Sequence, residues 1–302
     1  MKSRFQPDRG LTNRMLATTF LLGLLYVAFI ALLVAILRNA LVAVVIAGGL
    51  LFAQYWFSDR IALYAMNGRI VSPQEAPQLH AVVDRLCALA DMPKPAVAIA
   101  DVDLPNAFAT GRSPNKAVVC ATTGILRRLD PEELEGVLSH ELSHVAHRDV
   151  AVMTVASFLG VLAGLITRFG LYSGLFGGRR DNQDGNTALV VLTVVLVSAV
   201  VYALSFLLTR ALSRYRELSA DRAGALLTHR PSALASALVK VTGDISRIPT
   251  RDLRTAEAFN AFFFAPALSS GFSLSSLFST HPPLDKRLDQ LAQLSRQLGQ
   301  AV

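Results

Sequence analysis

The chain has 302 residues, of which 52% are hydrophobic and only 17% are charged, compared with about 25% charged residues in soluble domains. This composition and a mean hydropathy of +0.43 exclude an ordinary soluble protein, because so few charges cannot cover a water-exposed surface. The net charge is +7, but the chain carries no nucleic-acid recognition motif and no phosphate-binding loop. We therefore expect neither nucleic acid nor ATP as a partner.

Four apolar runs predict membrane-spanning helices, at residues 15–37, 40–57, 151–167 and 187–209. The first and fourth are each uncharged over 23 residues, which is enough to cross about 30 Å of hydrocarbon. Only two residues separate the first run from the second, so these two form a hairpin. The third run has 17 residues, the lower limit for a span, so a buried helix of a water-soluble domain is its alternative.

The distribution of Lys and Arg predicts the orientation. If both chain ends lie in the cytoplasm, 25 of the 29 basic residues are cytoplasmic, as the positive-inside rule requires. We expect a multi-pass cell-membrane protein with both termini inside and its positive charge facing anionic lipid. The runs divide the chain into an N-terminal hairpin (1–57), a first polar part (58–150), a second hairpin (151–209) and a second polar part (210–302).

The first polar part ends in a predicted helix that contains the sequence HELSH. Asp130 suits its N-cap and Pro131 its first helical position. His140 and His144 lie four residues apart, so both imidazoles can bind one ion from the same helix face. Glu141 is turned by about 100° from His140 and can reach a water on that ion. This is the H-E-x-x-H arrangement of zinc hydrolases, with two ligands and a general base; a polar face with uncommitted histidines is the alternative.

Hydrolytic zinc takes three protein ligands and one open position, so a third ligand is needed. His147 lies seven residues after His140, about 10.5 Å along a helix, which is too far to share the ion. Glu217 and Asp221 lie four apart on a predicted helix, two spans downstream and hence on the same membrane side. We expect Glu217 to bind the ion and Asp221 to accept the second ring N–H of a ligand histidine. A charged helix face paired with neighbouring arginines is the alternative.

With these motifs, the chain resembles the HtpX family of membrane zinc metalloproteases and, more distantly, the CAAX prenyl proteases. The similarity covers nearly the whole chain: a hairpin of spans, HELSH at 140–144, two further spans and RELSAD at 216–221. LPNAFATG at 104–111 and STHPPLDKRL at 279–288 are similar to two further motifs of that family. The resemblance implies one zinc ion per chain, a cytoplasmic active site, and endoproteolysis of damaged or misassembled membrane proteins in quality control and stress response.

Two further segments supply candidates for substrate binding and catalysis. Strand-like residues flank NAFATG, and a strand edge there can pair with an extended substrate backbone. Our substrate-binding candidates are Asn106, Ala107 and Phe108, although a turn after Pro105 explains Asn106 equally well. His281 precedes two prolines and is a candidate to stabilise the oxyanion of the reaction, with a turn leading into the next helix as its alternative.

The predicted fold is a mainly α membrane protein. Four transmembrane helices carry a cytoplasmic, zincin-like α+β catalytic domain with a small β-sheet. The predicted function is zinc-dependent hydrolysis of polypeptides, in which Glu141 takes a proton from water. A non-catalytic membrane scaffold with a four-ligand structural metal and a specific prenyl-protein processing protease remain alternatives. The sequence assigns no role to His147, to Arg287 or to the Phe-rich segment 259–278, which is either a loop near the cleft or a packed loop.

Overall fold

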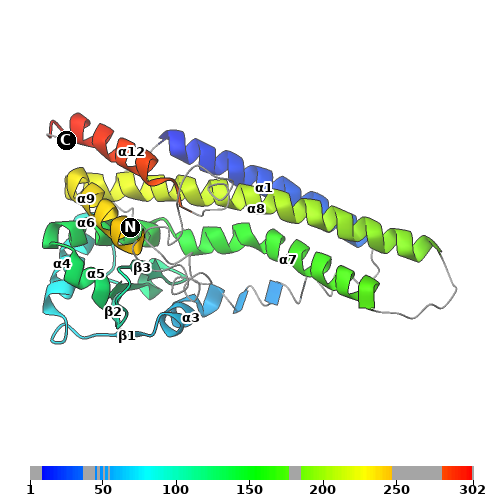
Figure 1. The fold of residues 1–302 in the computed structure, drawn as a ribbon, viewed down its shortest axis with the longest axis horizontal. Helices are drawn as coiled ribbons and strands as arrows, with labels where there is room; N and C mark the ends of the chain where they lie inside the picture. The colour runs from blue at the N-terminus through cyan, green and yellow to red at the C-terminus, as the bar shows by residue number, and fades with distance from the viewer. Residues whose placement is uncertain are drawn as a thin grey trace.

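The computed structural model describes residues 9–36, 45, 48–49, 52–53, 55–176, 185–246 and 281–300. Most of the predicted second span (40–57) and all of the Phe-rich segment 259–278 lie outside the described residues. Figure 1 shows a bundle of long helices with an α+β lobe at one end. The prediction of a mainly α protein with long apolar helices and a small β-sheet is confirmed.

Three long helices form the bundle: α1 (Arg9–Ile36), α7 (Asp149–Phe176) and α8 (Gly185–Thr228). Within the described part of the chain, these three are long and apolar enough to cross a membrane, over residues 9–32, 149–167 and 192–228. Their shared core includes Phe29, Leu162 and Val201. Side chains on the outside, such as Phe20 and Leu192, are more than half exposed, as lipid-facing residues are when no lipid is present.

The sheet of the lobe has four strands in the order β1-β2-β4-β3. The strands β2 and β4 are parallel, and the two outer pairings are antiparallel. The strand bounds are β1 (Gly68–Ile70), β2 (Ala96–Ala100), β3 (Ala107–Thr110) and β4 (Val118–Thr122). The strand β3, which carries the NAFATG motif, therefore lies at the edge of the sheet.

Helix α6 (Pro131–Ala146) is the centre of the lobe and packs against α4, α8, α9 and β3. Its start is the predicted one: Asp130 and Glu133 form a reciprocal capping box. Val137, Leu138 and Leu142 are fully buried, which contributes roughly 1.5–3 kcal/mol each. The other lobe helices within the described ranges are α3 (Ser58–Ala65), α4 (Pro77–Ala90), η1 (Pro114–Lys116), α5 (Thr123–Arg128), α9 (Pro231–Ser246) and α12 (Leu284–Gln297).

Close contact between α6 and α8 depends on Gly224. A Cβ at this position would lie 2.8 Å from Ser139 Oγ and 2.9 Å from the backbone nitrogen of His140. We expect Gly224→Ala to push the two helices apart and to lower the free energy of unfolding by about 1–3 kcal/mol, measured by thermal denaturation. Gly243→Ala in α9 is the matched control, since its Cβ would meet nothing within 4 Å, and it should not destabilise the protein. Equal melting temperatures for the two variants would contradict this.

Candidate metal centre and active site

The crossing of α6 and α8 brings together the side chains of His140, His144 and Glu217, whose potential ligand atoms all lie within 4.8 Å of one another. The two histidine Nε2 atoms are 3.1 Å apart. The carboxylate oxygens of Glu217 lie 3.7 Å from His140 Nε2 and 3.4 Å from His144 Nε2. Ligand atoms at about 2.0–2.1 Å from a tetrahedral zinc ion are about 3.3 Å apart. The three residues therefore fit a zinc ion, although the sequence alone fixes only the two histidines on one helix face.

Buried groups fix the ring of His140. Its Nδ1 lies 2.9 Å from Oδ1 of Asp221, and Arg287 donates two hydrogen bonds to that carboxylate, at 2.7 and 2.6 Å. All three side chains are at most 1% exposed. A carboxylate on Nδ1 holds the proton there and turns the Nε2 lone pair toward the cluster. Burial lowers the pKa of His140, which also favours the neutral, metal-binding form.

The ring of His144 is held by Asp149, a residue that the sequence analysis missed. Its Nδ1 lies 2.6 Å from Oδ2 of Asp149, and Asp149 in turn forms a buried ion pair with Arg216. Burial lowers the pKa of His144, but the hydrogen bond and charge of Glu217 outweigh burial and raise it overall. The one available sequence signal was an aspartate at the very start of an apolar run, where a charge is costly unless it is paired.

Glu141 lies beside the cluster and is only 6% exposed. Its Oε2 accepts a hydrogen bond of 3.0 Å from the backbone N–H of Ala109 on β3. Burial raises the pKa of Glu141 to about 8 in the absence of metal, and the charge of Glu217 acts in the same direction. A cation held by the neighbouring ligands would favour the carboxylate. The arrangement thus combines three candidate metal ligands with a carboxyl group that can exchange protons near neutral pH.

Comparison with known proteins agrees with this geometry. Residues 73–295 match the sequence profile described as Peptidase family M48, a range that contains every residue of the cluster. The chain belongs to peptidase family M48. The predicted resemblance is confirmed, and with its apolar helices the chain is a membrane metalloprotease.

Several relatives of this M48 peptidase cover its whole length. The chain is 67% identical to Protease HtpX homolog 1 of Streptomyces coelicolor, over 100% of this chain and 98% of the relative. It is 52% identical to the Protease HtpX homolog of Moorella thermoacetica, over 99% of both chains. Its fold resembles the crystal structure of Ste24p of S. mikatae, with a TM-score of 0.52, 16% identity, and coverage of 94% of this chain and 66% of that one.

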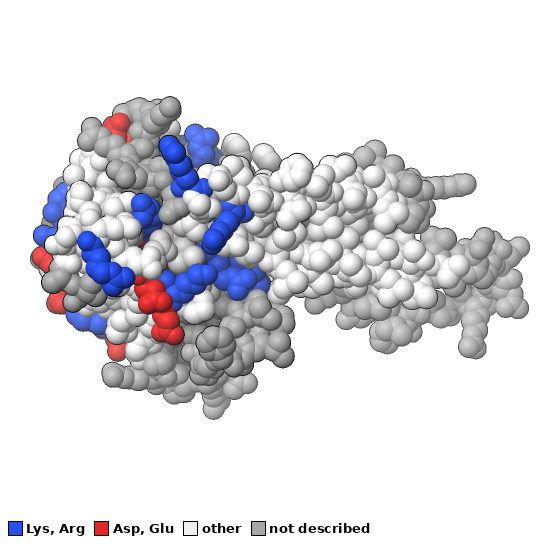
Figure 2. Space-filling view, turned by 90° about the horizontal axis from the view of Figure 1, so that it is seen from above, with Lys and Arg blue, Asp and Glu red and all other residues white. Residues whose placement is uncertain are grey.

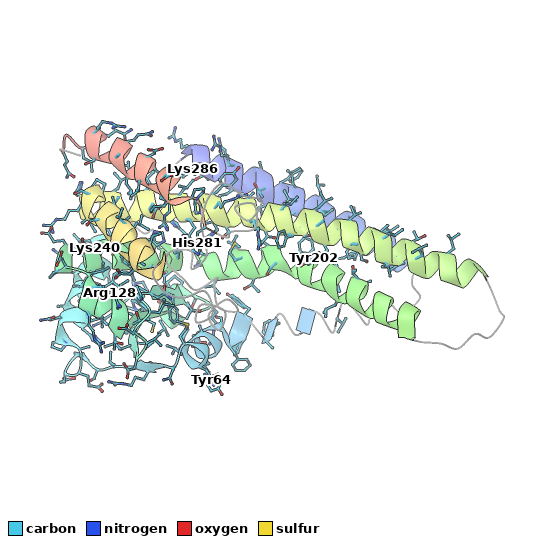
Figure 3. All side chains as sticks on the ribbon, in the orientation of Figure 1. Tyr64, Arg128, Tyr202, Lys240, His281 and Lys286 are labelled. Atoms are coloured by element: carbon cyan, nitrogen blue, oxygen red, sulfur yellow. The ribbon has the colours of Figure 1, made fainter. Side chains whose placement is uncertain are left out.

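In this M48 peptidase, His281 lies inside the molecule near α8 (Figure 3), whereas the labelled Tyr64 on α3 points outward. The Nδ1 atom of His281 lies 2.9 Å from Oε2 of Glu217. Arg287 Nη1 also approaches that oxygen, at 3.9 Å. Within the described residues, the metal cluster comprises only the two α6 histidines and Glu217, so His281 contacts a ligand without being part of the cluster.

The three substrate-binding candidates lie at the edge of the sheet, close to Glu141. The backbone N–H of Asn106 donates to Thr122 Oγ1, and its carbonyl accepts from the Thr122 N–H, both at 2.9 Å. These bonds fix the start of β3. The side chain of Phe108 is 3% exposed and packs in a core with Cys120, so contact with a substrate would use its backbone. His147 lies at the C-cap of α6, outside the cluster, and burial lowers its pKa to about 4.

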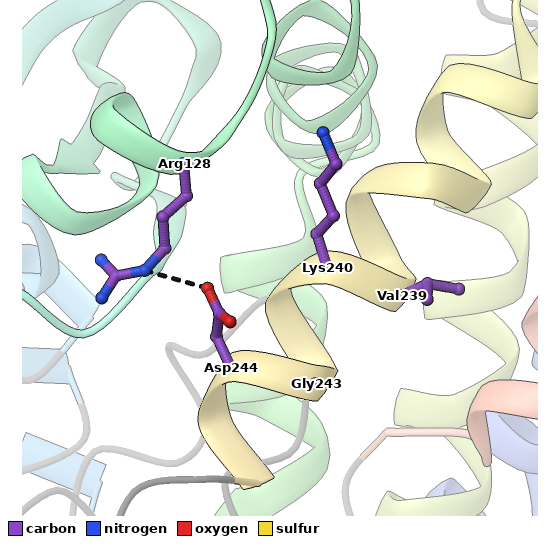
Figure 4. Close-up of a pocket in the computed structure, with 5 residues that line it drawn as sticks. All are labelled: Arg128, Val239, Lys240, Gly243 and Asp244. Carbon is purple, nitrogen blue, oxygen red and sulfur yellow. Dashed lines mark ion pairs between the residues drawn. The ribbon is translucent and has the colours of Figure 1, made fainter.

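A hollow of about 460 Å³ lies on the surface of the lobe, between α5 and α9 (Figure 4). It is lined by Arg128, Val239, Lys240, Gly243 and Asp244. Both cations already have partners: Arg128 Nε pairs with Asp244 Oδ2 at 2.9 Å, and Lys240 contacts Asp130 and Glu133 at 3.0 and 2.8 Å. None of these residues belongs to the metal cluster, so this hollow is separate from the candidate active site.

Proposed function

We propose that this M48 peptidase is a zinc-dependent endopeptidase that hydrolyses misfolded or damaged membrane proteins at the cytoplasmic membrane face. The observation that carries the proposal is the convergence of His140, His144 and Glu217 with Glu141 beside them. Three nitrogen and oxygen ligands leave one tetrahedral position open, which is typical of catalytic zinc, whereas structural zinc takes four protein ligands. This favours the enzyme over a non-catalytic scaffold.

Each residue has a defined role in the proposed mechanism. When bound, zinc polarises water and the scissile carbonyl. Glu141 takes the proton of the attacking water and passes it to the leaving amine, while the N–H of Ala109 holds its carboxylate in place. Asp221 orients His140, and Asn106, Ala107 and Phe108 present the backbone of β3 to the substrate. His281, next to Glu217, stabilises the oxyanion.

The proposed topology has four spans, with both termini and the active site in the cytoplasm. The two polar parts, 58–150 and 210–302, form one catalytic unit that is carried by the hairpins 1–57 and 151–209. The distribution of Lys and Arg supports this orientation. The likeness to Ste24p extends to the fold alone, so it does not favour a prenyl-protein substrate over unfolded polypeptides.

Removal of the metal tests the proposal. We expect a chelator to stop cleavage of an unfolded substrate by the membrane-reconstituted protein, and stoichiometric Zn²⁺ to restore it. Elemental analysis should give one zinc per chain before chelation and none after it. Cleavage that continues in the fully metal-free protein would contradict zinc catalysis, and zinc without any cleavage would favour the scaffold.

A further inference from the structure

The metal cluster lies close to the membrane end of the lobe, as α8 shows. This helix is continuous from the bundle into the lobe (Figure 1). Its residues 192–209 carry no charge, Arg210 is the first basic residue after them, and Glu217 follows seven residues later. At 1.5 Å per residue, Glu217 is about 10 Å along the helix from the point where the apolar segment ends.

Helix α7 indicates the same position for the cluster. Its apolar segment begins at Asp149, and Oδ2 of this residue lies 2.6 Å from Nδ1 of the ligand His144. Arg216, adjacent to Glu217 in the chain, forms the ion pair with Asp149. The candidate metal ligand His144 is thus in contact with the first residue of the candidate span 149–167.

The edge strand β3, which is the proposed substrate-binding strand, also leads to the membrane boundary. Arg112, just after β3, lies over the ring of Trp56 at 3.9 Å and donates to the Trp56 carbonyl at 3.1 Å. Tyr55 donates to the carbonyl of Arg112 at 2.6 Å. Trp and Tyr concentrate at membrane–water interfaces. Tyr55 and Trp56 are among the last three residues of the second apolar run, 40–57. Ala109, which contacts Glu141, precedes Arg112 by three residues, or about 10 Å of extended chain.

The charge distribution supports this boundary. On the face drawn in Figure 2, Lys and Arg side chains gather where the bundle joins the lobe, and the described residues of the bundle beyond them show no charged side chain on that face. Arg14 ends the charged start of α1 and lies 6.0 Å from the ring centroid of Tyr215 on α8. Arg210 therefore marks the boundary on α8. Arg14 and Asp149 lie beside Tyr215 and Arg216, next to Glu217, so the metal cluster is at most about 10 Å from that boundary.

The short distance between the membrane boundary and the metal cluster determines which peptide bonds of a membrane-anchored substrate can reach the site. A substrate chain needs about three extended residues to cover 10 Å, and about three more to pass one helix of roughly 10 Å diameter. With longer spacers, the effective concentration of a tethered segment falls approximately as the −3/2 power of its length. We propose that the enzyme prefers peptide bonds about three to ten residues from a membrane span, on the side of the catalytic lobe. This specificity rests on the proposed function.

The test uses the full-length protein in liposomes with a tethered substrate. The substrate has one apolar span followed by many identical, unstructured repeats, so that each cleavage position differs only in its distance from the membrane. Mass spectrometry of the products should show cleavage concentrated in the first ten or so residues. Bonds about 25 residues away should be cut roughly tenfold less than bonds about five residues away. Glu141→Gln is the inactive control, and the repeats without a span are the soluble control.

The outcomes separate this inference from the proposed function. Equal cleavage of near and distant repeats, or preferential cleavage of distant repeats, would overturn the distance preference and leave the endopeptidase intact. No cleavage of either the tethered or the soluble repeats, together with no cleavage of any other unfolded polypeptide, would overturn both. Uniform cleavage of the soluble repeats, combined with a steep distance profile for the tethered ones, is the result that we expect.

Discussion

Replacing Glu141 with Gln should lower the rate of peptide hydrolysis by about 10²–10⁴-fold while the metal stays bound. General acid–base catalysis by a positioned side chain is typically worth that factor. Glutamine has the same shape, and its side-chain oxygen can still accept the hydrogen bond from the Ala109 N–H, but it cannot take a proton from water. Single-turnover cleavage in liposomes and metal analysis of the same preparation measure the two properties separately.

The control for this variant is its metal content and melting temperature, both of which should equal those of the wild type. If Glu141→Gln cleaved peptides at the wild-type rate, the general base would be another residue. If it lost the metal, Glu141 would contribute to metal binding and not only to proton transfer.

Replacing Glu217 with Ala should abolish both metal binding and cleavage. Loss of a residue that merely orients a ligand weakens metal binding by about 10–100-fold, so loss of one of three ligands should exceed about a hundredfold. Competition with a chromophoric chelator measures the affinity directly. The conservative Glu217→Gln variant should also bind metal weakly, because it keeps the volume of the side chain but removes the charge that faces His144 and His281.

Glu132→Ala is the matched control for Glu217. Its carboxylate lies in the same lobe and pairs with Arg230, but both side chains are about half exposed or more, so the pair contributes little. This variant should keep wild-type metal affinity and activity. Full metal occupancy in folded Glu217→Ala would refute the third-ligand assignment.

The comparisons confirm the family and the metalloprotease activity that the sequence predicted. The sequence was sufficient for this prediction because the H-E-x-x-H pattern is local. The spacing of His140 and His144 becomes a shared helix face by helix geometry alone. Glu217 could be proposed because two predicted spans separate it from the histidines, and an even number of spans returns the chain to the same side of the membrane. Its distances to them, however, follow from how α8 packs on α6, where Gly224 allows the close approach.

The sequence by itself determined the apolar helices, the capped helix α6 and the residue types of the metal cluster, because helix period and span length depend only on neighbouring residues. Only the tertiary structure decided that Asp149 and Arg216 hold His144, that Arg287 binds Asp221, and that β3 is an edge strand whose Ala109 N–H reaches Glu141. The contact of His144 with Asp149 depends on the turn between α6 and α7, and the others join elements distant in sequence or depend on strand order. A buried charge needs a partner, but which partner it finds is fixed by packing rather than by spacing along the chain.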